Sequence, residues 1–213
     1  MTVNMTAVSQ PIIDAGLAET KDWLRIETAS DDAAIGALLR SAIGMAEDFC
    51  AQQMFARSGT ERLALSCEWT RLRACPVSAI SAVRAIAADG TATALAVGAY
   101  ALDITGDGDG WVRVSQSRAE TRLEVDIMAG VAADWPSLPD SLRQGIVRLA
   151  AHLFTERENS DAPPAIVTAL WRPWRRMLPS RPWRCMPSSR ARWSRPCVPW
   201  RWKAWAWPGC PAA

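Results

Sequence analysis

The residues best suited to chemistry lie in one short acidic stretch. Asp103, Asp107 and Asp109 are interspersed with glycines, in a pattern that resembles the start of a calcium-binding loop. Calcium prefers carboxylate oxygens, and an EF-hand loop that began at Asp103 would require a glutamate at its twelfth position. Val114 stands there instead, and strand-like patterns flank the stretch. The pattern therefore favours a turn between two strands over a metal site.

Other groups that could do catalysis or bind metal are scarce. The single histidine, His152, lies beside an apolar stripe, so we expect a structural or interface histidine and not a general base. The six cysteines include no CxxC pair, which leaves too few ligands for zinc and favours free thiols. The sequence contains no GxSxG, P-loop or GxGxxG motif. We therefore predict no catalytic residue, no metal, no cofactor and no enzymatic activity.

Charge is unevenly distributed along the 213 residues. Residues 1–170 carry 14 Lys and Arg against 22 Asp and Glu, whereas residues 171–213 carry 10 Lys and Arg and no acid. The net charge of +2 therefore combines a body of −8 with a tail of +10. The tail also contains 8 of the 12 Trp and 8 of the 14 Pro, so it is predicted to be irregular and to lack a core of its own.

The composition of this tail has three interpretations. Arginine and tryptophan together are typical of protein interfaces, which is the interpretation we favour. The same pair could bind nucleic acid, because arginine neutralises phosphates and indoles stack on bases. A GC-rich gene read out of frame at its end would also produce this composition.

The sequence contains no predicted membrane span or secretory signal. No segment approaches 18 uninterrupted apolar residues, and the first residues lack a basic region followed by an apolar one. We therefore expect a cytosolic site of synthesis and no contact with a membrane.

Hydrophobic periodicity predicts an α+β fold. Apolar residues recur at intervals of three and four in Ala15–Ile26, in residues 30–50, and in a helix that begins near Leu138-Pro139-Asp140 and ends at Arg157. A shorter helical stretch is predicted for residues 165–171. Between the helical halves, alternating patterns predict a small antiparallel sheet of about five strands within residues 60–130. The predicted strands are Leu63–Leu65, Ala79–Ile86, Tyr100–Ile104, Trp111–Val114 and Leu123–Met128.

Four motifs in this order resemble one known family. The first combines Lys21, Leu24, Arg25 and Ile26 with the acidic pair Asp31 and Asp32. The second comprises Pro76, Val77, Ile80 and Val83, the Asp89-Gly90 hairpin, and Tyr100 with Asp103. The third is LPDSLRQGIVRLAAHLFTERE, which contains His152 and Arg157 and has Gly145 where the family usually has alanine; the fourth is ALWRPWRRM at residues 169–177. Together they resemble the head–tail connector, or adaptor, proteins of long-tailed phages, and most closely the adaptors of gene transfer agents.

The resemblance implies an organisation and a role. Together with the change in composition, it divides the chain into an N-terminal arm (residues 1–14), a head–tail connector domain (residues 15–170) and the basic tail (residues 171–213). The resemblance covers about residues 15–177 and does not extend to the tail beyond Met177. It also implies a structural protein of a virion or virion-like neck, made in the bacterial cytoplasm. Its partners would be the portal protein, a stopper or tail-completion protein, and further copies of itself in a ring of twelve, with DNA passing through the ring without specific binding.

The tail supplies the predicted partner-binding residues. We predict that its first residues contact the portal, namely Trp171, Arg172, Trp174, Arg175 and Arg176. The alternative is a nucleic-acid-binding accessory protein that uses the basic tail.

Overall fold

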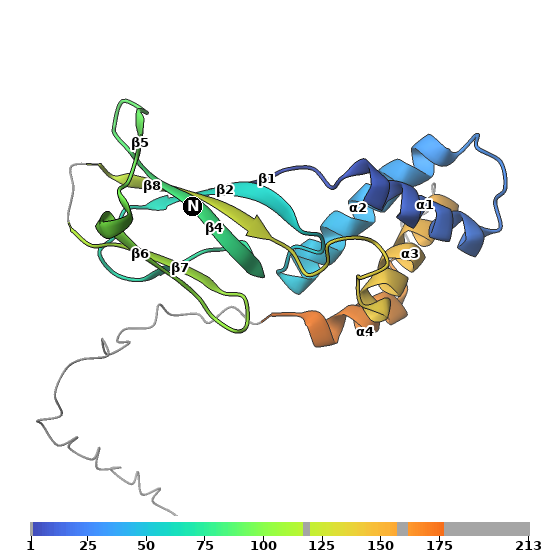
Figure 1. Cartoon of the computed structure of the whole chain (residues 1–213). Helices are drawn as coiled ribbons and strands as arrows, with labels where there is room; N and C mark the ends of the chain where they lie inside the picture. The colour runs from blue at the N-terminus through green and yellow to red at the C-terminus, as the bar shows by residue number, and fades with distance from the viewer. Residues whose placement is uncertain (1, 117–119, 157–161, 177–213) are drawn as a thin grey trace, which may run out of the picture. The chain divides into compact units, whose positions relative to one another are not determined.

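The structure is a computed structural model that describes residues 2–116, 120–156 and 162–176. The chain divides into two compact units, Met1–Ser180 and Arg181–Ala213, and every described residue belongs to the first. The elements follow the order β1 (Thr2–Met5), α1 (Gln10–Leu24), α2 (Asp32–Cys50), β2 (Arg57–Ala64), β3 (Thr70–Arg71), β4 (Val77–Ile86), β5 (Ala92–Ala94), η1 (Val97–Ala99), β6 (Tyr100–Ile104), β7 (Gly110–Val114), β8 (Arg122–Ala129), α3 (Asp140–Thr155), α4 (Ala165–Trp171) and η2 (Arg172–Trp174). Helices and antiparallel strands occupy separate parts of the fold, so the predicted α+β class is confirmed (Figure 1).

Among the strands, β2 begins at Arg57, six residues before the predicted start at Leu63. Among the helices, α1 differs most from its predicted bounds. α1 begins at Gln10, five residues before the predicted start at Ala15. Pro11 occupies the first turn, where a residue without an N–H group breaks no helical hydrogen bond, and Ile12 and Ile13 are buried. Arg25 ends the helix in the left-handed conformation, with φ of 57°. The structure thus places part of the predicted N-terminal arm inside a helix.

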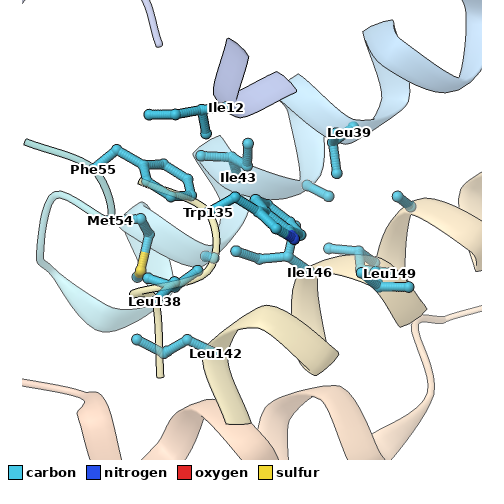
Figure 2. Close-up of a cluster of buried hydrophobic side chains, with 14 of the residues drawn as sticks. Ile12, Leu39, Ile43, Met54, Phe55, Trp135, Leu138, Leu142, Ile146 and Leu149 are labelled. Atoms are coloured by element: carbon cyan, nitrogen blue, oxygen red, sulfur yellow. The ribbon is translucent and has the colours of Figure 1, made fainter. Parts of the chain in front are cut away.

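One hydrophobic core lies among the helices (Figure 2). α2 contributes Leu39 and Ile43, and α3 contributes Ile146 and Leu149, all of them buried. Trp135 precedes α3 and stacks on Phe55, with ring centroids 5.9 Å apart and an interplanar angle of 22°. These residues lie far apart in the sequence, so the core joins the two helical segments that flank the strands.

The strands form two antiparallel sheets, which corrects the prediction of a single sheet. The five-stranded sheet has the order β1-β2-β8-β4-β5, and the three-stranded sheet has the order β3-β7-β6. All five predicted strands are present, as β2, β4, β6, β7 and β8. β1, β3 and β5 contain four residues or fewer, which is too short to show an alternating pattern in the sequence.

A second hydrophobic core lies between these sheets. Leu63 and Val125 from the five-stranded sheet meet Val112 and Val114 from the three-stranded sheet, and all four side chains are buried. The opposite face of the five-stranded sheet is polar. There Arg84 forms ion pairs with Glu124 at 3.0 Å and with Asp126 at 2.5 Å. None of the described helices is long and apolar enough to cross a membrane.

The three described cysteines are free thiols, and we predict that they react at different rates. Burial raises the pKa of Cys50 and of Cys75 to about 11, whereas Cys67 is exposed. Only the thiolate is nucleophilic, so at pH 8 iodoacetamide should alkylate Cys67 at least roughly tenfold faster than Cys50 or Cys75. Mass spectrometry of the peptides after a short pulse measures these rates. Equal labelling of Cys50 and Cys67 would contradict the burial of Cys50.

Candidate partner-binding segment at the end of the described fold

The predicted partner-binding residues fall at the end of α4 and in the short turn that follows it. A proline marks the start of each of these two elements: Pro164 precedes the first residue of α4, and Pro173 lies in the first turn of η2. Proline is favoured at a helix start and cannot donate a backbone hydrogen bond further along. The backbone therefore leaves α4 as a single 3-10 turn. We call residues 171–176 the C-terminal segment.

Trp171 lies inside the helical core. Its side chain is 3% exposed, and its Nε1 donates a hydrogen bond to the carbonyl oxygen of Leu142 at 3.3 Å. Its ring lies 5.9 Å from that of Phe49, centroid to centroid. A Cβ atom at Gly145 would overlap the indole. Trp171 therefore anchors the C-terminal segment to the body and is not on the surface.

Trp174 and its backbone also face the body. Its Nε1 donates a hydrogen bond to Ser141 Oγ at 2.8 Å, and the Gln52 amide donates to its carbonyl oxygen. The indole is half-buried. Part of its surface remains available to a partner.

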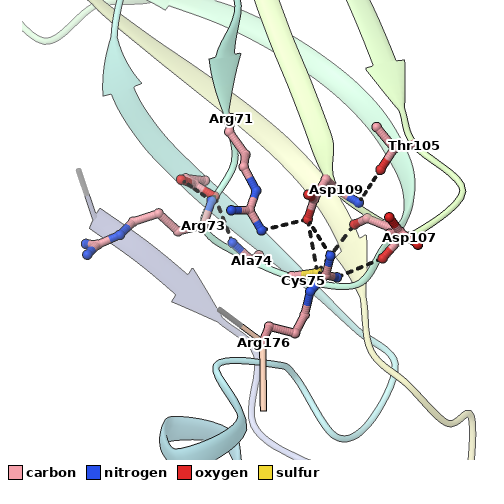
Figure 3. A network of polar contacts seen from close by, with 10 residues as sticks. Arg71, Arg73, Ala74, Cys75, Thr105, Asp107, Asp109 and Arg176 are labelled. Carbon is pink, nitrogen blue, oxygen red and sulfur yellow. Dashed lines mark hydrogen bonds and ion pairs between the residues drawn. The ribbon is translucent and has the colours of Figure 1, made fainter. Parts of the chain in front are cut away.

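Arg176 joins the C-terminal segment to the turn between β6 and β7 (Figure 3). Its Nη2 lies 2.9 Å from Asp109 Oδ1, and its Nη1 donates to the carbonyl oxygen of Asp107 at 2.7 Å and to the Cys75 sulfur. Its backbone N–H donates to the carbonyl oxygen of Cys50 at 3.0 Å. Both the backbone and the side chain of Arg176 are thus held by the body.

Arg172 and Arg175 remain as the exposed cations of the segment. The Arg175 guanidinium carbon lies 5.7 Å from the centroid of the Phe49 ring, a distance typical of a cation–π contact. Their charges can therefore reach a partner while the tryptophans hold the backbone in place. The five predicted residues occur together, but their surroundings divide them into anchoring and exposed residues.

The acidic stretch forms a turn, as predicted. β6 and β7 are joined there, and Gly108 adopts φ of +78° where a Cβ atom would lie 2.5 Å from Pro76 Cβ. Asp109 Oδ1 lies 2.7 Å from Arg71 Nη2 as well as contacting Arg176. Within the described residues, no group of three or more His, Cys, Asp or Glu side chains could hold a metal ion.

Of the remaining candidate residues, the structure describes His152. His152 is half-buried on α3. An open depression of about 590 Å³ lies on the polar face of the five-stranded sheet, where hydrogen bonds to Asp126 and Glu124 raise the pKa of Arg84. Arg157 and the tail from residue 177 lie outside the described residues.

Sequence reasoning missed the residues that hold the segment. Ser141, Gln52 and Asp109 each contact it, although they belong to three different elements or turns. None of these three contacts had a signal in the sequence. The packing of Trp171 had one, because Gly145, which lies against the indole, stands where the connector motif usually has alanine. A glycine within a helix has no side chain, so it leaves room for a large ring such as an indole to pack directly against the helix backbone.

Comparisons with known proteins identify close structural relatives. No model of a protein family matches the chain, and no curated protein matches it. Among solved structures, a chain in the neck of an empty gene transfer agent (GTA) particle, computed with C6 symmetry, has a TM-score of 0.70 and 28% identity. A chain in the virion of a native GTA particle has a TM-score of 0.67 and 30% identity, and one in the neck of a native GTA particle, computed with C12 symmetry, has 0.65 and 29%.

These matches extend over most of the molecule. Each covers 85% of this chain and 100% of the GTA chain. One family assignment follows from three observations: the agreement in fold, the sequence identity of up to 30%, and the four motifs in order. The protein belongs to the head–tail connector family of gene transfer agent particles and is a structural component of a particle neck.

Proposed function

We propose that this chain is the adaptor of its particle neck, a ring of twelve subunits between the portal protein and a stopper or tail-completion protein. The single observation that carries this proposal is the match over the full length of GTA neck chains, in necks computed with C6 and C12 symmetry. A ring built from one kind of chain uses a head-to-tail contact between two different surfaces. The role is structural and requires no catalytic group.

The charge of the body suits a conduit for DNA. Residues 1–170 carry a net charge of −8, and like charge keeps duplex DNA from adhering to a surface. We propose that DNA passes through the ring without specific binding. The alternative, a nucleic-acid-binding accessory protein, would depend on the basic tail, and no described contact favours it.

The contact with the portal is proposed to involve the exposed part of the C-terminal segment. Arg172 and Arg175 present guanidinium groups, and Trp174 is half-exposed beside them. Arginine and tryptophan are the residue types that most often dominate the energy of an interface. Trp171 and Arg176 contribute by holding this surface against the body.

Replacing both exposed arginines tests this contact. The double variant Arg172→Ser/Arg175→Ser should bind the portal of the same particle at least roughly tenfold more weakly, because truncated interface arginines often cost more than 1 kcal/mol each. Binding is measured by titrating labelled portal rings with the full-length chain. Arg73→Ser/Arg122→Ser removes the same charge from two exposed arginines of the strand region and should bind normally.

Two outcomes would count against the proposal. Unchanged portal binding by Arg172→Ser/Arg175→Ser would remove the C-terminal segment from the contact. A wild-type chain that ignores the portal but binds duplex DNA, with an affinity that falls steeply with salt, would support the accessory function instead. A truncation after Arg176, which keeps the segment and removes the rest of the tail, separates the contributions of the two regions.

A further inference from the structure

The turn between β6 and β7 contains one carboxylate that binds two arginines. Asp109 Oδ1 lies 2.7 Å from Arg71 Nη2 and 2.9 Å from Arg176 Nη2. Arg71 lies on β3, close to this turn, whereas Arg176 comes from the far end of the described chain. Figure 3 shows both guanidinium groups converging on Asp109. The carboxylate thus joins the three-stranded sheet to the C-terminal segment.

The turn is rigid enough to act as a fixed support. The Thr105 N–H donates to the Asp109 carbonyl at 3.0 Å, and the Asp109 N–H donates to Thr105 Oγ1 at 3.1 Å. The Gly108 carbonyl accepts a hydrogen bond from the Val77 N–H at 2.8 Å, which ties the turn to β4. Asp109 is therefore positioned independently of the C-terminal segment.

The contact is sheltered more than an ordinary surface ion pair. The side chains of Arg176 and Asp109 are each 20% exposed. Exposed ion pairs contribute little because water screens them, whereas a charge-assisted hydrogen bond with restricted water access is stronger. Arg176 also directly follows Arg175 and lies close to Arg172, the two exposed cations of the segment.

We propose that Asp109 is a positioning residue that holds the C-terminal segment in place. It thereby orders Arg172 and Arg175 before they meet the partner. The statement about binding to the partner rests on the proposed function. The pair formed by Asp109 and Arg176 is the clasp. A segment ordered in advance loses less conformational entropy on binding, which increases affinity without a new contact. Asp109 touches no partner and acts only through Arg176.

Amide hydrogen exchange of residue 176, followed by NMR on the full-length chain, tests the clasp. The Arg176 N–H donates to the Cys50 carbonyl, so its protection reports whether the segment is seated. Asp109→Asn keeps the shape but removes the charge, and should lower the protection factor about tenfold, the size expected for loss of one charge-assisted hydrogen bond. Arg176→Gln should have a similar effect and leaves the pair of Asp109 and Arg71 intact. Arg176→Lys keeps the charge and should recover part of the protection.

Neighbouring aspartates provide matched controls. Asp107 contributes its backbone carbonyl to Arg176, so Asp107→Asn removes a carboxylate from the same turn and should leave the protection unchanged. Amides of β4 and α3 should keep their protection in every variant. If they lost it together with residue 176, the clasp variants would be acting by general unfolding and the proposal would be overturned.

Portal binding supplies the second measurement. Asp109→Asn and Arg176→Gln should each weaken binding severalfold while Asp107→Asn binds normally, because the unclasped segment must be ordered on docking. Unchanged protection in Asp109→Asn overturns the clasp, and lost protection with unchanged portal affinity overturns the positioning role. If the wild-type chain does not bind the portal, the proposed function fails, while the exchange experiment still decides whether Asp109 holds the segment.

Discussion

Trp171→Ala is expected to lower the free energy of unfolding by about 3–5 kcal/mol, the range for removal of a large aromatic side chain from a core. The indole is 3% exposed, contacts Phe49, and donates to the Leu142 carbonyl. Its loss leaves a cavity between α3 and α4 and removes the donor for that carbonyl. This would be a large fraction of the stability of an ordinary domain.

Urea unfolding followed by circular dichroism measures this effect. Trp23→Ala is the matched control, because Trp23 is 52% exposed and its described ring contact is one cation–π interaction with Arg148. The control should cost about 1 kcal/mol or less. A loss of less than about 1 kcal/mol for Trp171→Ala would show that the indole is not packed in the core.

Gly145 provides an independent check on the same contact. In the wild-type chain Gly145→Ala should destabilise, because the added Cβ overlaps the Trp171 indole. In the Trp171→Ala background the same change should be neutral or stabilising by up to about 1 kcal/mol, since alanine favours a helix more than glycine does. This change of sign identifies the pair and would not arise if each residue acted alone.

The anchoring of Trp171 also changes how the tail can be tested. A chain cut after Leu170 would lose the buried indole together with the exposed arginines, so failure to join a particle would not distinguish poor docking from poor folding. The informative cut follows Arg176, which leaves the anchor and the clasp in place.

Glu61→Ala is expected to destabilise the strand region by about 2–4 kcal/mol, because it leaves buried backbone donors without partners. Glu61 is fully buried at 0% exposed. Its two carboxylate oxygens accept hydrogen bonds from the Arg73 N–H at 2.9 Å, and Oε2 also accepts one from the Ala74 N–H at 3.3 Å. These bonds hold the loop between β3 and β4 against β2.

The same residue makes a prediction about pH. Burial raises the pKa of Glu61 above the ordinary value of 4.5, although the backbone hydrogen bonds oppose that shift. Between 4.5 and the raised pKa the folded state binds more protons than the unfolded chain, so the contribution of Glu61 to stability falls as the pH rises through this window. The destabilisation by Glu61→Ala should therefore be greater near pH 4.5 than at pH 7.5.

Urea titrations at the two pH values measure both effects. Glu68→Ala, which removes an exposed carboxylate from the same region, should change stability by less than about 0.5 kcal/mol at either pH. Equal stability of Glu61→Ala and Glu68→Ala would contradict the role of the buried carboxylate.

The sequence by itself determined the elements whose patterns are local. The stripes of α2 and α3, the five longer strands and the turns at Asp89-Gly90 and Gly106–Gly110 all follow from periodicity and turn chemistry. The four sequence motifs, in their order along the chain, indicated the connector family. Each of these signals lies within about 20 residues, the length of chain over which a helix or a hairpin determines which side chains face the same way.

Tertiary structure alone decided which surfaces are covered. Periodicity could not show that β1 pairs with β2 across more than 50 residues, or that the strands divide into two sheets. It also could not distinguish Trp171, which is buried against Gly145, from the exposed Arg172 beside it. Burial of a side chain depends on the distant element that packs over it. The acidic turn depends on neighbouring residues alone and was therefore predicted correctly from the sequence. The pairing of Asp109 with Arg176 joins residues that are distant in the sequence, so it became visible only in the fold.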